Sequence, residues 1–397
     1  MDNQFRGQSR QQTTSSRRSI AMTAAFPRWV RRNLLATPFD TALSILFIPL
    51  CLWMLFSVGN WAITQAQWHV VGDNLRVLMV GTLPSEMTIQ PWLATGILAL
   101  VSGMTVALVT CTRPRVLGIG VDIAALAAAG CAFTGSIQLA CALGCVATGL
   151  AGWLAVDFWP SLRKMVGVAW LLGLLSIGAL LAPAGTERWG GLLMGVLFTL
   201  LAAILSVPLG IGLALGRRSR FASARTICTG YIEVMRSLPL ILIVYWVWII
   251  TPLVSPQNAM PDLVRGLLGF TLFFAAYVAE YVRSGLQSVP RGQIEAAQSL
   301  GLSPAQISRD VVLPQALRVV MPALVGNVLD IFNNVPLLFI IGLTDFLRAG
   351  QMVLVNPQSG GRTYELYAFM FLVYLAVASV ITFGARRLEA RMAIGHR

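Results

Sequence analysis

Three polar side chains lie within one long apolar stretch of the sequence, where a polar group is costly without a role. Asp330, Asn333 and Asn334 are spaced so that the second and third follow the first by three and four residues, which places them on one face of a helix. The carboxylate can bind an ammonium group, and the amide N–H groups can bind a carboxylate. The pattern predicts a binding face for a zwitterion; a polar clasp between two helices is the alternative.

Glu280 and Arg283 form a second charged pattern in another apolar stretch. Residues three apart meet on the surface of a helix, so we expect an ion pair. A charged group at the centre of a membrane helix costs about 2.5–3.5 kcal/mol on insertion scales, and such groups usually serve a function. We therefore predict that Glu280 contributes to a solute path or links that path to a docking element.

The helices that position these residues are predicted from composition. The 397 residues are 56% hydrophobic and 11% charged, with a mean hydropathy of +0.74. Apolar runs of roughly 18 residues or more are long enough to cross a bilayer as helices. We predict an all-α polytopic membrane protein with about ten transmembrane helices. The predicted spans are residues 40–59, 92–110, 117–136, 138–156, 165–183, 191–215, 237–255, 266–283, 319–343 and 364–385.

The formal net charge of +13 would suggest nucleic acid in a soluble domain. In a membrane protein, basic residues in short loops set the orientation instead. With the N-terminus inside, all but five of the 29 Lys and Arg residues also fall inside. The five outside are Arg76, Arg188, Arg265, Arg348 and Arg362. We predict a membrane protein with both termini in the cytoplasm and no nucleic-acid partner.

The longest polar run in the second half of the chain, residues 295–314, has the pattern of two short helices joined by a bend. Ser303 can cap the second helix, with Pro304 in its first turn and Gln306 completing an S-x-x-Q capping box. Gly301 stands before this helix, and glycine readily takes the positive φ that ends a helix. We predict a docking element between two spans.

This run, EAAQSLGLSPAQISRDVVLP, resembles the EAA motif of ABC importer permeases, with Val311 in place of isoleucine. The flanking sequence AAYVAEYVRSGLQSVPRGQIEAAQSLGL (residues 275–302), together with GRRS and LPQALR, is similar to the polar amino acid branch of that family. The resemblance covers about residues 191–390. Before it, NLRVLMVGTLP (residues 74–84) looks like the long permease subunit of general L-amino-acid importers.

The resemblance implies that residues 295–314 seat in a groove of a cytoplasmic ATPase. Glu295 would begin the first coupling helix and provide a charged anchor or a helix-to-helix hydrogen bond. The small Ala296 and Ala297 would allow close approach, and Gly301 would supply the bend. Pro314 would close the unit. The implied coupling residues are Glu295, Ala296, Ala297, Gly301, Leu302 and Pro314.

The resemblance also implies a location in the bacterial inner (cytoplasmic) membrane and a division of the chain. Residues 1–38 would form a basic cytoplasmic tail and residues 39–190 an N-terminal extension of about five spans. Residues 191–390 would form the five-helix core of a type I ABC importer permease, with a coupling loop at residues 284–318. The implied partners are a cytoplasmic ATPase that uses ATP, a second permease subunit in a heterodimer, an extracytoplasmic substrate-binding protein and an amino acid. The outer loop 344–363 is either a contact for an extracytoplasmic partner or a plain connector.

One stretch departs from the family pattern. Polar amino acid permeases usually read F-K-D-T-S-L where this chain reads FNNVPL, residues 332–337. Losing the Lys–Asp pair changes the expected charge preference for the substrate, or leaves the main substrate site to the second permease subunit. A permease for an opine or a sulfur-containing amino acid is the alternative.

Other classes of protein fit the sequence less well. Lys164 is the only lysine, and the G-x-x-x-x-G-K-[ST] phosphate loop is absent, so we expect no ATPase site in this chain. Two histidines, His69 and His396, are too few for a metal or catalytic cluster. An ion-coupled secondary transporter would predict internal repeats, which the sequence does not contain. We expect neither an enzyme nor a bound cofactor.

Overall fold

The computed structural model describes residues 34–109, 136–254, 260–359 and 361–393. It divides the chain into two units, Met1–Gln67 and Trp68–Arg397, and each is treated by itself. Most of the predicted tail (residues 1–33) and most of the third predicted span (residues 117–135) lie outside the described residues. The seam predicted near residue 190 stays a prediction.

The first unit contains α2 (Pro38–Thr64). Thr37 caps its start by accepting a hydrogen bond from the Asp40 N–H at 3.1 Å, and Pro38 occupies the first turn, where a missing N–H costs nothing. Its apolar side chains are exposed on every side, as expected of a helix surrounded by lipid. α2 matches the first predicted span.

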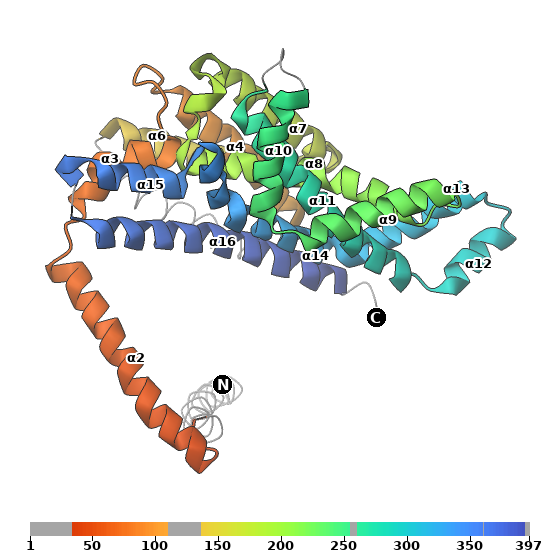
Figure 1. Ribbon diagram of the computed structural model, residues 1–397, viewed down its shortest axis with the longest axis horizontal. Coiled ribbons are helices and arrows are strands. Elements are labelled where there is room, and N and C mark those ends of the chain that lie inside the picture. The colour runs from red at the N-terminus through yellow and green to blue at the C-terminus, as the bar shows by residue number, and fades with distance from the viewer. Residues whose placement is uncertain (1–33, 110–135, 255–259, 360, 394–397) are drawn as a thin grey trace, which may run out of the picture. The chain divides into compact units, whose positions relative to one another are not determined.

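The second unit is nearly all helix, and its long helices lie at predicted spans. They are α4 (Gln90–Val109), α6 (Ser136–Phe158), α7 (Val166–Leu181), α8 (Gly191–Arg217), α10 (Leu240–Val254), α11 (Asp262–Ser288), α14 (Leu313–Asn334) and α16 (Thr363–Ala393) (Figure 1). The span predicted at 319–343 consists of α14 and the 3₁₀ helix η5 (Val335–Ile341). Short 3₁₀ turns lie at Pro160–Met165 (η1), Ala182–Ala184 (η2), Thr186–Arg188 (η3) and Pro357–Ser359 (η6).

The predicted fold class, an all-α polytopic membrane protein, is confirmed. Within the described residues, seven helices are long and apolar enough to cross a membrane, or eight if the bent pair α9–α10 counts as one span. The predicted number of about ten is not established, because the third span is not described and the apolar part of α6 is short.

Glycines allow the central helices of the second unit to approach closely. A Cβ placed on Gly210 in α8 would lie 2.7 Å from the carbonyl oxygen of Ala275 in α11. A Cβ on Gly285 in α11 would lie 2.6 Å from the carbonyl oxygen of Ala316 in α14. Both separations are too short for any side chain, so α8, α11 and α14 form one tightly packed core.

The segment 217–236, predicted as a loop on the inner side, contains the helix α9 (Ala222–Ser237). Its apolar and polar residues lie on different faces of the helix, so its mean hydropathy does not mark a span. α9 and α10 meet at an angle of 113°. The bend falls at Leu238 because the following Pro239 disfavours helical backbone at the residue before it.

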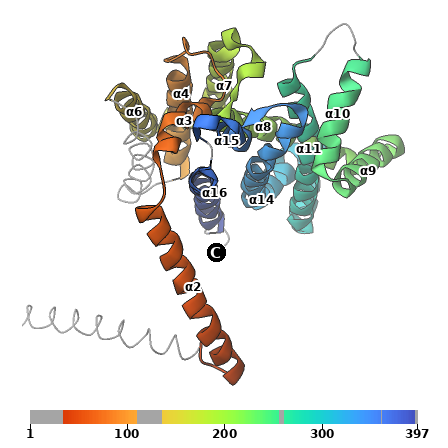
Figure 2. The same ribbon diagram turned by 60° about the vertical axis from the view of Figure 1, so that its left-hand side comes forward.

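The loop predicted at residues 60–91 also contains a helix, α3 (His69–Val80), which packs against α15 (Phe346–Val355). The buried side chains of α3 are Val70, Val71 and Leu78. They pack in a cluster that includes Leu366 and Met370 of α16. Figure 2 shows α3 and α15 beside each other. The sequence does not mark α3 as a span, because a twelve-residue amphipathic helix is too short to register as one.

A glycine junction joins α3 to the start of α8 and to the short strand β1 (Thr344–Asp345). It consists of Gly81, Gly190, Gly191 and Thr344. Gly190 forms a parallel β-bridge with Thr344, and Gly191 forms one with Asp345. Gly81 has φ +70°, and a Cβ on it would lie 2.4 Å from the Gly190 Cα. Only glycine fits at position 81 on both grounds, conformation and space.

Candidate functional site

The coupling loop begins with α12 (Arg291–Ser299), at the end of the second unit opposite α3 and α15 (Figure 1). The expectation that Glu295 begins this helix is wrong, because the helix starts four residues earlier, directly after the extended Pro290. Glu295 and Ala296 are exposed in its middle, whereas Ala297 is buried. The helix therefore has one open face and one packed face.

Gly301 ends α12 in the conformation predicted for it. Its φ is +78°, and the Leu302 N–H donates to the Ala297 carbonyl at 3.3 Å, which is the long hydrogen bond of a Schellman cap. A Cβ on Gly301 would meet nothing within 4 Å. The position therefore needs glycine for its backbone and not for space. Leu302 is half-buried.

The predicted capping box is present. The Gln306 N–H donates to the Ser303 hydroxyl at 3.4 Å, and the Ser303 N–H donates to the Gln306 side-chain oxygen at 2.9 Å. The box opens α13 (Pro304–Gln306), which continues through the π-helical turn η4 (Ile307–Val312) into α14. Pro314 therefore does not close the unit as expected: it lies exposed in the first turn of α14, where proline is favoured.

The coupling loop is anchored on its packed face and open on the other. Ala297, Ile307 and Val312 are buried in a cluster with residues from the ends of α11 and α14, including Val282 and Val320. On the open face Leu300 is 80% exposed. Sequence reasoning missed Leu300. An apolar side chain of this size on a polar loop is the signal that could have found it.

The predicted ion pair between Glu280 and Arg283 is confirmed, with Arg283 Nε donating to a Glu280 oxygen at 2.8 Å. Two further guanidinium groups reach the other Glu280 oxygen, from Arg217 at 3.4 Å and from Arg236 at 3.5 Å. Arg217 also pairs with Glu233 at 3.1 Å. This arginine cluster ties the ends of α8 and α9 to α11. Sequence spacing could not find it, because its members lie on separate helices.

The three polar residues predicted as a substrate face all lie near the end of α14. Asp330 and Asn333 are exposed, but the Asn334 side-chain amide donates to the Asp330 backbone carbonyl at 2.8 Å. Nearby Asn327 is buried, and its side-chain oxygen finds no hydrogen-bond partner among the described residues. Asp330 and Asn333 therefore stay candidates for the substrate path, while the amide of Asn334 already has a partner within its own helix.

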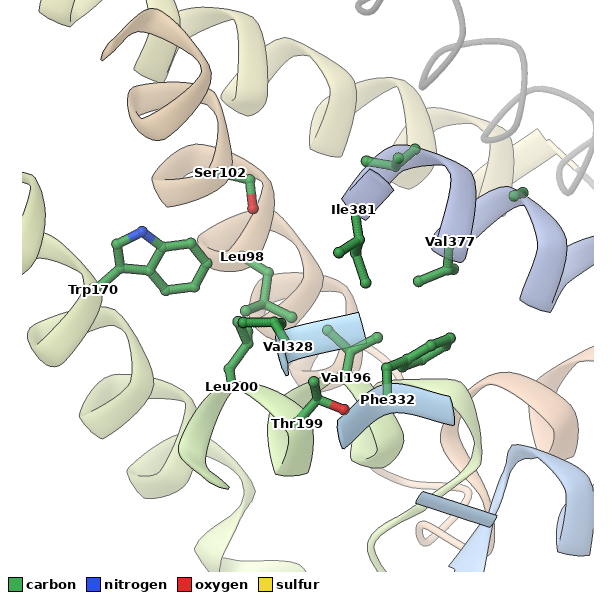
Figure 3. A pocket seen from close by; sticks show the side chains of 12 residues that line it. Leu98, Ser102, Trp170, Val196, Thr199, Leu200, Val328, Phe332, Val377 and Ile381 are labelled. Atoms are coloured by element: carbon green, nitrogen blue, oxygen red, sulfur yellow. The ribbon is translucent and has the colours of Figure 1, made fainter. Parts of the chain in front are cut away.

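A cavity of about 340 Å³ lies between the predicted extension and the predicted core (Figure 3). Its walls come from α4, α7, α8, α14 and α16, and are apolar except for two hydroxyls, on Ser102 and Thr199. The Thr199 hydroxyl is already bonded to the Gly195 carbonyl at 2.8 Å. Such a surface is unsuited to a charged solute. No group of three or more potential metal ligands occurs in the part of the chain that the structure describes.

Comparison with known proteins shows to which family this chain belongs. A family model described as "Binding-protein-dependent transport system inner membrane component" matches residues 206–394. The "Glutamate/aspartate import permease protein GltK" of Escherichia coli O6:H1 (strain CFT073) is 31% identical over 195 residues, 47% of this chain and 85% of that protein. The chain belongs to the family of ABC importer permeases. The resemblance predicted from the coupling motif is confirmed.

Two further relatives differ in how much of their length matches this permease. "Inner membrane amino-acid ABC transporter permease protein YhdY" of Escherichia coli (strain K12) is 38% identical over 211 residues, and this permease spans only 58% of its length. "Glutamate/glutamine/aspartate/asparagine transport system permease protein BztC" of Rhodobacter capsulatus is 28% identical over 415 residues, 93% of this permease and 94% of BztC. The permease is thus a multi-pass inner-membrane transport subunit.

Proposed function

We propose that this permease is the membrane subunit of an ATP-driven importer for amino acids and that residues 284–318 receive the movement of a cytoplasmic ATPase. The observation that carries the proposal is the coupling loop. Its bend is set by Gly301 and its second helix by the Ser303 cap. Its open face presents Leu300. A loop held in one conformation with an exposed apolar residue suits a protein partner.

The proposed orientation of the chain in the membrane rests on the distribution of its arginines. In the topology predicted from the sequence, most arginines outside the apolar stretches fall on the same side as the coupling loop, which supports a cytoplasmic position for both termini and for the loop. The ATPase that binds there would use ATP, and this chain would perform no bond chemistry. The opposite end, with α3 and α15, would meet the substrate-binding protein. A second permease subunit would complete the membrane part as a heterodimer.

Movement of the loop would reach the membrane helices through packing. Ala297, Ile307 and Val312 lie in one cluster with the ends of α11 and α14. The arginine cluster around Glu280 joins α8 and α9 to the same end of α11. A push on the loop would therefore move these helices as one body, which is the geometry of alternating access by rigid-body rotation. Glu280 would link the path to the loop.

Amino acids are the solutes that best fit the known relatives and the charged groups in the spans. The names of the relatives YhdY, BztC and GltK refer to amino acids. Asp330 offers a carboxylate near the end of α14, within a predicted span, where an ionisable group usually serves transport.

The docking claim is tested by two substitutions at one position. Gly301→Val should abolish co-purification of the ATPase, because a β-branched residue strongly resists positive φ and would redirect the loop. Gly301→Asn is the matched control, since asparagine tolerates this conformation and a Cβ has free space there. We expect at least half of the wild-type ATPase to co-purify with Gly301→Asn. Equal co-purification of both variants would contradict the docking claim.

The energy source is tested separately. Uptake of labelled amino acids into vesicles should stop when the cognate ATPase carries an inactivating substitution. Uptake that continues would mean an ion gradient drives transport, and the ATP-driven function would be wrong.

A further inference from the structure

We propose that the cavity between α4, α7, α8, α14 and α16 holds an acyl chain of a membrane phospholipid, and that Arg387 of α16 binds the phosphate of the same lipid. The lipid fills the space between the predicted extension and the predicted core. The site takes a lipid whatever solute the importer carries, so it is independent of the proposed function.

The cavity is large enough that leaving it empty is costly. Its volume of about 340 Å³ is more than twice the roughly 150 Å³ that holds a benzene molecule in an apolar protein interior. Atoms that line an empty space lose packing contacts, and the loss of stability grows with the volume of that space. An occupant that contacts the walls therefore stabilises the fold.

Water is a poor occupant, because a buried water needs several polar partners. The Thr199 hydroxyl already donates to a carbonyl of its own helix, and the Trp170 indole N–H donates to the Thr105 hydroxyl at 2.8 Å. Ser102 supplies the one remaining hydroxyl among the lining residues, and the other side chains are aliphatic or phenylalanine. The occupant that suits these walls is apolar.

The depth of the cavity matches the ends of lipid tails. Leu98 of α4 and Val328 of α14 line it, and each lies near the middle of its predicted span. Figure 3 shows Leu98 and Ile381 of α16 on different sides of the space. The hydrocarbon region is about 30 Å thick, so the acyl chains of both leaflets end near its middle. The end of an acyl chain therefore reaches the cavity without leaving the bilayer.

An exposed track along α16 leads out of the cavity. Val380 lines the cavity and is still 49% exposed, so it lies at the opening. Phe383, which is 39% exposed, follows three residues later, and Arg387 follows four residues after that. This spacing places the three side chains on one face of the helix. Seven residues advance that face by about 10.5 Å, so one acyl chain can lie along it between the cavity and Arg387.

Arg387 is the cation at the end of this track, just beyond the span predicted at residues 364–385. Its guanidinium carbon lies 4.6 Å from the centre of the Phe383 ring. Contact with a ring uses the flat face of the guanidinium group, so N–H groups at its edge can bind a phosphate through two parallel hydrogen bonds. None of the ion pairs found among the described residues includes Arg387.

The two ends of the site set the class of lipid. The cavity takes a hydrocarbon chain and Arg387 takes a phosphate, so phosphatidylglycerol satisfies both ends. A diacylglycerol with the same chains satisfies only the cavity. Because α4 and α7 belong to the predicted extension and α8, α14 and α16 to the predicted core, the bound chain contacts both and holds them together.

The experiment uses the complete importer in detergent, with phosphatidylglycerol that carries a photoreactive group at the end of one acyl chain. Illumination should attach this lipid to residues of the cavity, identified by mass spectrometry of the peptides. At limiting lipid, Arg387→Gln should lower the labelling about fivefold, as expected for one lost contact between an arginine and a lipid headgroup. Ala376→Phe, which places a ring in the cavity, should abolish it. The matching diacylglycerol should label the wild type about as weakly as phosphatidylglycerol labels Arg387→Gln.

Arg386→Gln is the matched control, because Arg386 is an exposed arginine next to Arg387 on a different face of α16. It should be labelled like the wild type. Equal labelling of Arg387→Gln and Arg386→Gln would overturn the proposal, as would labelling of the wild type confined to peptides outside the cavity. If Ala376→Phe fails to assemble, the comparison of the two arginine variants decides alone.

Discussion

The two ends of the second unit each depend on a glycine with positive φ, yet for different reasons. Gly81 at the glycine junction has φ +70°, and any Cβ there would overlap the backbone of Gly190. Gly301 in the coupling loop has φ +78°, and a Cβ there would meet nothing within 4 Å. The first glycine is required by packing within the chain. The second is required only by the direction of the backbone.

This difference separates a sealed end from an open one. The junction end buries Asp345 completely and holds α3, β1 and the start of α8 together. The coupling-loop end exposes Leu300 and most of α12. Substitutions at the junction should therefore unfold the protein, whereas substitutions in the coupling loop should leave it folded and weaken what binds there.

The largest effect is expected at Gly81. Gly81→Val combines a β-branched residue at positive φ with overlap of the Gly190 backbone, and should lower the free energy of unfolding by about 3–5 kcal/mol. Thermal unfolding of the purified protein in detergent measures the loss. Gly178→Ala in α7, where a Cβ meets nothing within 4 Å, is the control and should unfold like wild type. An unchanged unfolding temperature for Gly81→Val would show that the junction is not tightly packed in the membrane.

A smaller loss is expected at Asp345, which caps α15. Its carboxylate accepts hydrogen bonds from the Leu347 and Arg348 N–H groups, both at 3.0 Å, and from the Tyr374 hydroxyl at 3.3 Å. Asp345→Ala leaves these three donors without their acceptor and should cost about 2–4 kcal/mol. Thermal unfolding again gives the measurement, and a loss below that of a surface substitution such as Asp73→Asn would contradict the buried cap.

The same residue predicts a pH dependence. Burial raises the pKa of the Asp345 carboxyl above its ordinary value, although its hydrogen bonds with Arg348, Leu347 and Tyr374 act to lower it. The folded protein then holds this proton more tightly than the unfolded chain, whose aspartates titrate near about 3.9. The free energy of unfolding should therefore fall as pH rises from there through the raised pKa, and Asp345→Asn should flatten that slope. An identical slope in Asp345→Asn and wild type would exclude this residue as the cause.

The smallest effect on stability is expected at Ser303, in the open coupling loop. Ser303→Ala removes the acceptor for the Gln306 N–H and should cost about 1 kcal/mol. Because the cap sets the start of the second coupling helix, ATPase binding should weaken even though the protein stays folded. Ser299→Ala, which removes a hydroxyl bonded within α12, is the control and should bind the ATPase normally. If both variants bind it equally, the cap does not position the docking face.

Features set by residues close together in the sequence could be predicted, whereas contacts between separate helices could not. The spans follow from long apolar runs, and the Ser303–Gln306 box follows from residues three apart, so both were predicted from local pattern. α3 and α9 were missed because an amphipathic helix at a membrane surface does not raise the mean hydropathy. The contacts of Glu280 with Arg217 and Arg236 were also missed, because no local spacing links three helices.

The substrate face shows the same limit. Asp330 was recognisable as a carboxylate in an apolar helix, and its neighbours at helical spacing suggested amide partners. In the structure the Asn334 side-chain amide donates a hydrogen bond to the Asp330 backbone carbonyl, which spacing alone could not reveal.

The packing of α3 has a consequence for the order of events during synthesis. Thr82, next to the junction glycine, donates to the carbonyl of Arg188, 106 residues later. The apolar face of α3 is covered by α8, α15 and α16, and the part supplied by α16, through residues such as Met370, comes roughly 300 residues further along the chain. At 5–20 residues per second, α3 would wait about 15–60 seconds for this cover. An amphipathic helix can spend that interval lying in the membrane interface, so the bilayer would act as a temporary partner for the helix that the finished permease encloses.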